Sequence, residues 1–84
     1  MNDFYLTVRT VPRGQRGREA LARAGLRCAL VRAPRAIAPG GCAYALALRR
    51  RDGGRAEALL AGAGVPVEGR WLRTPAGDYA RAEP

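Results

Sequence analysis

Residues 19–26 read EALARAGL, and residues 57–65 read EALLAGAGV. Each stretch has apolar residues at helical spacing, then a glycine, then an apolar residue that opens the next segment. A glycine directly after a helical pattern is the usual signal for the end of a helix. The repeated pattern therefore predicts two copies of one unit, in which a helix stops at a glycine and a strand follows.

The segments around these two stretches complete the expected order of elements. Residues 4–10, FYLTVRT, place alternate side chains on opposite sides and predict a half-buried strand before the first helix. Pro12 and Gly14 are expected to break the chain after this strand, and Asp52 is expected to cap the second helix. The expected strands are residues 4–10, 26–32, 42–49 and 65–73, and the expected helices are residues 15–24 and 52–64.

The resulting order, βαββαβ, is that of the ferredoxin-like α+β fold. We expect a four-stranded antiparallel sheet with two helices on one face. The opposite face is expected to stay open for a partner, another subunit or a ligand. The 84 residues suffice for one small domain, which we place at residues 1–73. Residues 74–84, rich in proline, glycine and charge, are expected to form a flexible C-terminal tail.

The composition excludes several classes of function. The chain has no histidine, two cysteines and no CxxC or HxxxH spacing, so we expect neither a metal site nor a cofactor. Paired carboxylates and a glycine-rich phosphate loop are also missing, which argues against a conventional hydrolase. No segment approaches ~20 consecutive apolar residues, and the first residues do not resemble a signal peptide. We therefore expect no membrane association and a cytoplasmic protein with reduced thiols.

The charge of the chain permits two interpretations. The formal net charge is +8, and all fifteen cationic residues are arginine. Such a balance indicates an anionic partner, such as nucleic acid or an acidic protein. The lack of lysine and the abundance of alanine, glycine and proline also fit a GC-rich coding bias that acts on surface positions. The densest cluster, residues 49–51, then marks a solvated turn at a strand end.

Cys42 is the main candidate for chemistry. Gly40 and Gly41 precede it and the small Ala43 follows it, at the point where a loop meets a strand. Glycines allow backbone N–H groups to converge on an anion such as a thiolate, and Arg35 in the same loop can add positive charge. Gly40, Gly41 and Ala43 are the candidate binding residues, and Arg35 is the candidate support of the thiolate. The alternative is that Cys42 is only a small residue that opens a strand.

Cys28 differs from Cys42 because it lies within an expected strand, where a free cysteine behaves as a small core hydrophobe. If Arg32 lies opposite Cys42 in a hairpin, Cys28 lies opposite Leu46. The two cysteines are then about 13–14 Å apart at the normal strand rise. A disulfide requires Cα atoms within about 7 Å, so no internal disulfide is expected.

The chain resembles the selenium/sulfur carrier protein-like domain family of prokaryotes, whose function is largely uncharacterised. The resemblance covers about residues 4–73, and its most specific parts are Pro34-Arg35, Cys42 with its leading glycines, and the VEGRW stretch at residues 67–71. It implies that Cys42 is the carrier thiol and that Arg35 is its supporting cation. The family usually has a Cys-Gly pair, whereas this chain has Cys42-Ala43, which loses the freedom to adopt a positive φ.

From these residues and this resemblance we expect a sulfur or selenium carrier that holds the atom on Cys42 as a persulfide or selenopersulfide. It would be a carrier or accessory protein rather than a multi-turnover enzyme, and its partners would be donor and acceptor proteins. The alternative is a non-catalytic ferredoxin-like module that binds a protein or nucleic acid. The sequence leaves open whether the chain forms a homodimer.

Overall fold

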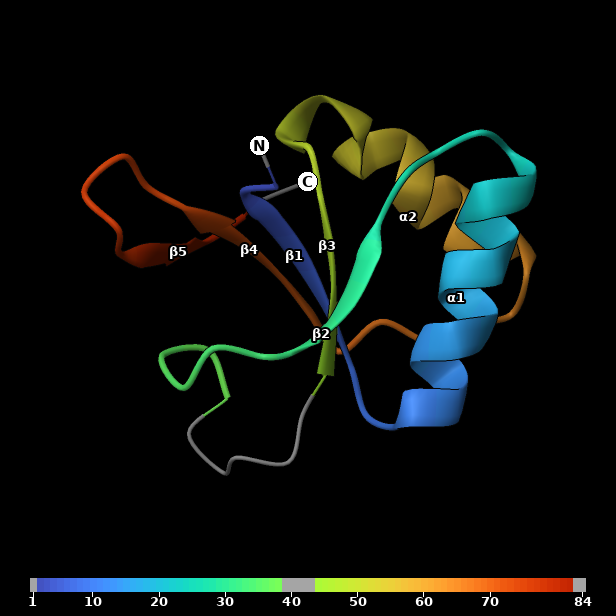
Figure 1. Ribbon diagram of the computed structural model, residues 1–84, viewed down its shortest axis with the longest axis horizontal. Helices are drawn as coiled ribbons and strands as arrows, with labels where there is room; N and C mark the ends of the chain where they lie inside the picture. Colours follow the sequence, from blue (N-terminus) through green and yellow to red (C-terminus); the bar gives the residue numbers. More distant parts are fainter. Residues whose placement is uncertain (1, 39–43, 83–84) are drawn as a thin grey trace.

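The computed structural model describes residues 2–38 and 44–82 and shows an α+β protein with two helices and a five-stranded antiparallel sheet (Figure 1). The expected order βαββαβ is present and a fifth strand follows it. The elements are β1 (Phe4–Val8), α1 (Val11–Arg23), β2 (Ala29–Arg32), β3 (Tyr44–Leu48), a 3₁₀ turn (Arg50–Asp52), α2 (Gly53–Gly62), β4 (Gly69–Arg73) and β5 (Tyr79–Arg81).

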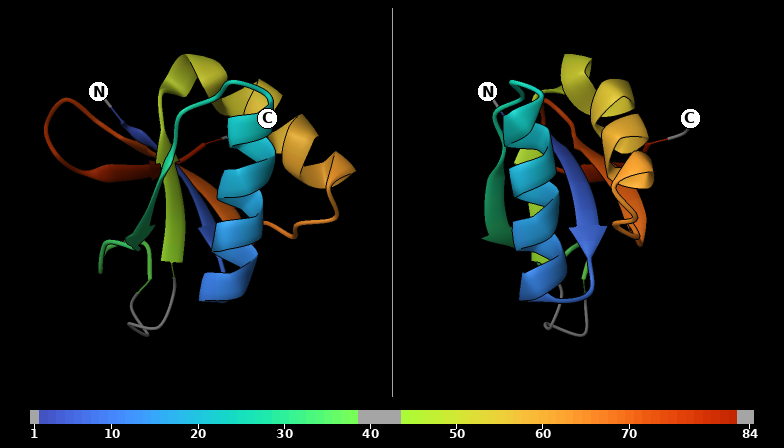
Figure 2. Two further views of the ribbon diagram at one scale, coloured as in Figure 1. Left: turned by 45° about the vertical axis from the view of Figure 1, so that its right-hand side comes forward. Right: turned by 90° about the vertical axis from the view of Figure 1, so that its right-hand side faces the viewer.

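The strands are arranged in the order β2-β3-β1-β4-β5, and every neighbouring pair is antiparallel. Both helices cover the same face of the sheet (Figure 2). The sheet has five strands rather than the expected four, because residues 79–81 pair with β4. Ala82 follows β5, is buried, and donates its N–H to the Arg70 carbonyl at 2.9 Å. Residues 79–82 of the expected tail are therefore held against the sheet. No helix among the described residues is long and apolar enough to cross a membrane.

The helix stop in residues 19–26 is a Schellman cap. Gly25 adopts φ +82° and donates its N–H to the Ala22 carbonyl at 3.0 Å. The next N–H, of Leu26, reaches back to the Leu21 carbonyl at 2.9 Å. This pair of hydrogen bonds satisfies carbonyls that the helix end leaves free, and it brings two leucines together. Both leucines are buried in the main core.

The second stretch, residues 57–65, forms the same cap at the end of α2. Gly64 has φ +71° and donates to the Ala61 carbonyl, and the Val65 N–H reaches the Leu60 carbonyl at 3.0 Å. Leu60 and Val65 are buried in the same core as their counterparts after α1. The sequence repeat thus encodes one structural device used twice, which turns the chain from a helix back towards the sheet.

Gly64→Ala is expected to lower the free energy of unfolding by about 1 kcal/mol, because an L side chain is strained at a positive φ. Gly62→Ala is the matched control: Gly62 ends α2 without a positive φ, and an added Cβ would meet no other atom within 4 Å. This control should leave stability unchanged or slightly higher. Urea denaturation of both variants measures the difference. Equal effects at the two positions would contradict the cap.

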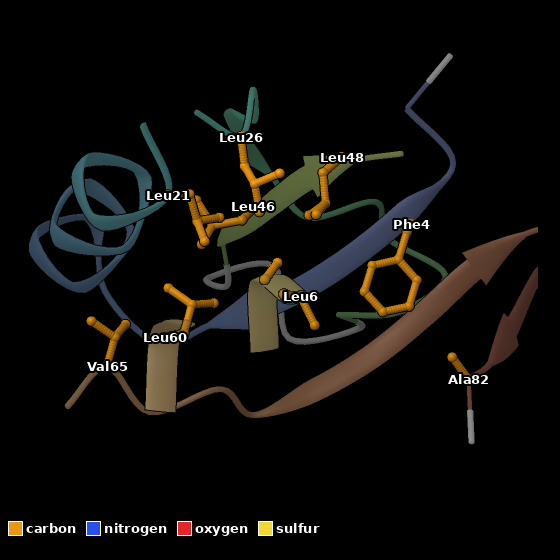
Figure 3. Packing of buried hydrophobic residues seen from close by; sticks show 10 residues of the cluster. Phe4, Leu6, Leu21, Leu26, Leu46, Leu48, Leu60, Val65 and Ala82 are labelled. Atoms are coloured by element: carbon orange, nitrogen blue, oxygen red, sulfur yellow. The ribbon is translucent and has the colours of Figure 1, made fainter. Parts of the chain in front are cut away.

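The main core lies between the helices and the sheet (Figure 3). Leu6 and Leu46 from the sheet and Leu21 and Leu60 from the helices are fully buried in it. These residues belong to a single cluster of buried side chains, Phe4, Leu6, Leu21, Leu26, Leu46, Leu48, Ala56, Leu60, Val65 and Ala82. Alternation along β1 and β3 sends their other side chains to the second face of the sheet.

Helix α1 begins at Val11, four residues before the expected start. Thr10 caps it by accepting a hydrogen bond from the Arg13 N–H at 3.3 Å, and Pro12 lies in the first turn, where its missing N–H costs nothing. The expected break at Pro12 and Gly14 is therefore wrong. The glycines of α1 instead allow the helix to approach the sheet closely. A Cβ on Gly17 would lie 2.9 Å from the Leu46 Cδ1 atom.

Candidate functional site

The structure describes the surroundings of the candidate thiol but not the thiol itself. Cys42, Gly40, Gly41 and Ala43 lie outside the described residues. Arg35 is described and is exposed. The site can therefore be built from the residues on both sides of the stretch 39–43. This stretch is the second half of the connection between β2 and β3, which covers residues 33–43.

The first half of this connection is packed against the second face of the sheet. Residues 34–38 form a turn in which the Ile37 and Ala38 N–H groups donate to the Pro34 carbonyl at 3.0 and 3.1 Å. This turn is held by a second cluster of buried residues, Tyr5, Ala33, Ile37, Ala38, Ala45 and Ala47. The second face is thus partly covered by the chain's own turn, which corrects the expectation that it is open.

Arg35 lies on this turn with its side chain in solvent, while Ile37 and Ala38 are buried two and three residues further along. The fixed turn therefore holds the backbone of Arg35 against the sheet and leaves the guanidinium free to meet an anion. No ion pair joins Arg35 to another described residue. Arg35 is thus an exposed cation on the first half of the β2–β3 connection.

The second half of the connection ends at Tyr44, the first residue of β3. Tyr44 pairs with Val8 of β1 on one side and with Arg32 of β2 on the other. Cys42 stands two positions before this residue in the sequence. The register differs by two residues from the expected one, in which Arg32 lay opposite Cys42. As a result, Leu30 rather than Cys28 lies opposite Leu46.

Positive charge gathers at this end of the sheet. Arg32 and Arg35 are exposed there, and α1 begins three residues after Val8 with no acidic residue in its first turn. The N-terminus of a helix carries a partial positive charge that favours nearby anions. The nearby carboxylate of Glu68 is paired with Arg9 at 3.2 Å. The described groups at this end therefore favour a negative charge.

Cys28 lies at the opposite end of β2, one residue before the strand begins, and is a free thiol. Its side chain is half-buried and packs against the main core, which fits a small core hydrophobe. Burial raises the pKa of the Cys28 thiol, and the positive charge of Arg18 only partly opposes this effect. Cys28 is therefore poorly suited to act as a thiolate near neutral pH.

The sequence analysis missed the second buried cluster. Trp71 packs against it from β4, with the Arg81 guanidinium 5.4 Å from the centre of its ring. The rings of Tyr79 of β5 and Tyr5 pack edge-on, with 5.6 Å between their centres. The signal that could have revealed this layer is the apolar pair Ile37-Ala38 in a loop otherwise rich in proline and glycine.

Comparison with known families gives a match over residues 3–72 to the family described as putative Se/S carrier protein-like. The chain belongs to this family. The resemblance seen in the sequence is thereby confirmed. Neither the curated proteins nor the solved structures give a significant match to the chain.

The matched segment of this Se/S carrier-like chain runs from before β1 to Leu72, the penultimate residue of β4, and includes the β2–β3 connection and both cysteines. Strand β5 and Ala82 lie beyond it. The element that makes the sheet five-stranded is thus outside the part of the chain that defines its family membership.

Proposed function

We propose that this Se/S carrier-like protein accepts a sulfur or selenium atom on Cys42 and passes it to an acceptor protein. The observation that carries the proposal is the cationic end of the sheet at which the β2–β3 connection starts and finishes, with Arg32, Arg35 and the N-terminus of α1. Positive groups lower the pKa of a neighbouring thiol and so produce a nucleophilic thiolate near neutral pH.

The transfer step needs only a thiolate and a donor persulfide. The Cys42 thiolate attacks the outer sulfur of the persulfide on the donor cysteine. A new S–S bond forms on Cys42, the S–S bond of the donor breaks, and its electron pair leaves with the donor thiolate. No separate oxidant is required, and the same exchange applies to a donor selenopersulfide. Delivery to the acceptor repeats the exchange in the other direction.

The surroundings of Cys28 and the sequence around Cys42 support a division of roles between the two thiols. Cys28 is half-buried beside the core, and burial raises its pKa. Cys42 follows in the sequence a turn that carries the exposed cation Arg35. The proposed carrier therefore keeps Cys28 as a protonated, structural thiol and uses Cys42 as the reactive thiol.

The pH dependence of alkylation tests this difference between the thiols. In a Cys28→Ser variant, we expect the remaining Cys42 thiol to ionise below the ordinary value of about 8.5. In a Cys42→Ser variant, we expect Cys28 to ionise above the value of a small free thiol, because its burial disfavours the thiolate. The rate of alkylation by iodoacetamide, followed from neutral to alkaline pH, measures the ionisation of the remaining thiol in each variant.

The Cys28→Ser variant should also accept sulfur from a small-molecule persulfide with the same pH dependence as its alkylation, since both reactions use the thiolate. Arg35→Glu in this background should move both profiles to higher pH, because it replaces a cation with an anion. A Cys42 profile that is identical to that of a free thiol and unmoved by Arg35→Glu would contradict the proposed role of Arg35.

A further inference from the structure

Arginines also gather at the other end of the fold, away from the β2–β3 connection. β1 begins and β3 ends at this end, since Phe4 pairs with Leu48. The end of α1, the segment before β2 and the start of α2 meet there (Figure 1). Arg55 of α2 donates to the Ala24 carbonyl at 3.2 Å, and the Arg50 N–H donates to Asp3 Oδ1 at 3.2 Å. The arginines of these segments are Arg23, Arg27, Arg49, Arg50, Arg51 and Arg55.

A surface hollow lies among these segments. We call it the arginine hollow, and its lining includes Asn2, Arg27, Arg49, Arg51 and Asp52. All three arginines are exposed. The hollow thus presents three cations and one carboxylate from two separate segments of the chain, residues 25–29 and residues 49–52.

The three arginines of the arginine hollow form no ion pair with another described residue. Two ion pairs are found among the described residues, Arg9 with Glu68 and Arg70 with Glu57. Neither of them involves an arginine of the hollow. The side chains of Arg27, Arg49 and Arg51 also make no hydrogen bond to another described residue. Their donors are therefore available to an external anion, and arginine is well suited to bind a carboxylate with two parallel hydrogen bonds.

We propose that the arginine hollow docks an acidic polypeptide segment of a partner protein. The inference rests on the charge and position of the hollow and does not depend on the carrier chemistry of Cys42. A partner bound here leaves the opposite end of the sheet uncovered, because Arg49 follows the C-terminal end of β3 whereas Tyr44 begins it. Docking and reaction would then use separate ends of one small domain.

The aromatic residues favour an acidic polypeptide over single-stranded nucleic acid. Sites for single strands combine cations with aromatic side chains on which bases stack. The chain has five aromatic residues. Phe4 is buried in the main core, Tyr5, Trp71 and Tyr79 belong to the second face, and Tyr44 begins β3 at the other end. The arginine hollow therefore has no stacking platform among the described residues.

The test uses a short, fluorescently labelled oligoglutamate peptide as the probe and fluorescence anisotropy as the readout. Arg49→Glu/Arg51→Glu should weaken binding by at least about tenfold, because two attractive pairs become repulsive. The matched control is Arg13→Glu/Arg16→Glu, which changes the net charge equally in the first half of α1 and should retain most of the binding.

Binding by the wild type should fall as salt is added. Circular dichroism verifies that both variants are folded.

Three outcomes would overturn the proposal. The first is that the wild type does not bind the peptide at low salt. The second is an equal loss in the two charge-reversal variants, which would show that net charge alone attracts the probe. The third is tighter binding of a single-stranded oligonucleotide than of the peptide, with that binding abolished by Arg49→Glu/Arg51→Glu. A loss of peptide binding in Arg49→Glu/Arg51→Glu but not in Arg13→Glu/Arg16→Glu supports the proposal. This result does not depend on whether Cys42 can be loaded with sulfur.

Discussion

Leu46→Ala is expected to lower the free energy of unfolding by about 2–5 kcal/mol, the cost of removing a fully buried leucine. Leu46 lies in the middle of β3 between Leu6 and Leu30, and its solvent exposure is 0%. Its Cδ1 atom also fills the space that Gly17 leaves open beneath α1. The substitution would therefore leave a cavity between the sheet and the helix.

A domain of this size has a total stability of roughly 4–13 kcal/mol, so the loss would be a large part of it. The matched control is Leu59→Ala in α2, because Leu59 is only partly buried against the same core. Its effect should be clearly smaller. Urea denaturation of the two variants measures the difference. Similar losses at both positions would contradict the packing of α1 on β3.

Most of the element order could be predicted because its signals are local. Each helix ends at a glycine that adopts a positive φ, and the residue after that glycine is apolar and buried. This cap needs only a few consecutive residues, so its pattern is visible in EALARAGL and again in EALLAGAGV. The alternation in residues 4–8 is equally local, although every residue of β1 is buried.

The fifth strand could not be predicted in the same way. Tyr79–Arg81 contains three residues, and the segment before it, TPAGD, has the composition of a tail. The strand exists because it pairs with β4, and because a turn at Gly77, with φ +90°, returns the chain to the sheet. Such a short strand is stabilised by long-range pairing rather than by its own sequence.

The start of α1 was misplaced for a related reason. Proline and glycine are local signals for a break, and Pro12, Gly14 and Gly17 fall within six consecutive residues. In the structure, the glycines serve a tertiary contact, since a Cβ on Gly14 would collide with the side chain of Leu30. A sequence pattern cannot distinguish a glycine that ends a helix from one that lets it approach a sheet.

The candidate site was predictable from the sequence in part. Cys28 packs against the core as expected, and Arg35 is exposed on the loop. The expected register of the β2–β3 hairpin is wrong by two residues. Arg32 pairs with Tyr44 rather than with Cys42, because β3 begins at Tyr44. The roles of Cys42 and its neighbours Gly40, Gly41 and Ala43 stay predictions.

Cys42→Ser is expected to abolish loading with sulfur completely, since a hydroxyl cannot form a persulfide. Cys28→Ser is the matched control and should load as the wild type does, because Cys28 is half-buried and its pKa is raised. Intact-mass spectrometry after incubation with a persulfide donor measures an adduct that a reductant removes. The same comparison with selenite and a thiol tests selenium. An adduct that survives in Cys42→Ser and disappears in Cys28→Ser would assign the chemistry to the other thiol.

Peptide mapping of the loaded wild-type chain tests the central claim most directly. Cleavage after arginine places the two cysteines on separate peptides, residues 28–32 and residues 36–49. The protein is loaded with a persulfide donor, its sulfur groups are capped by alkylation, and the digest is analysed by mass spectrometry. We predict that the added sulfur is found on the peptide of residues 36–49. Sulfur found on residues 28–32, or divided equally between the two peptides, would contradict the assignment of Cys42 as the carrier thiol.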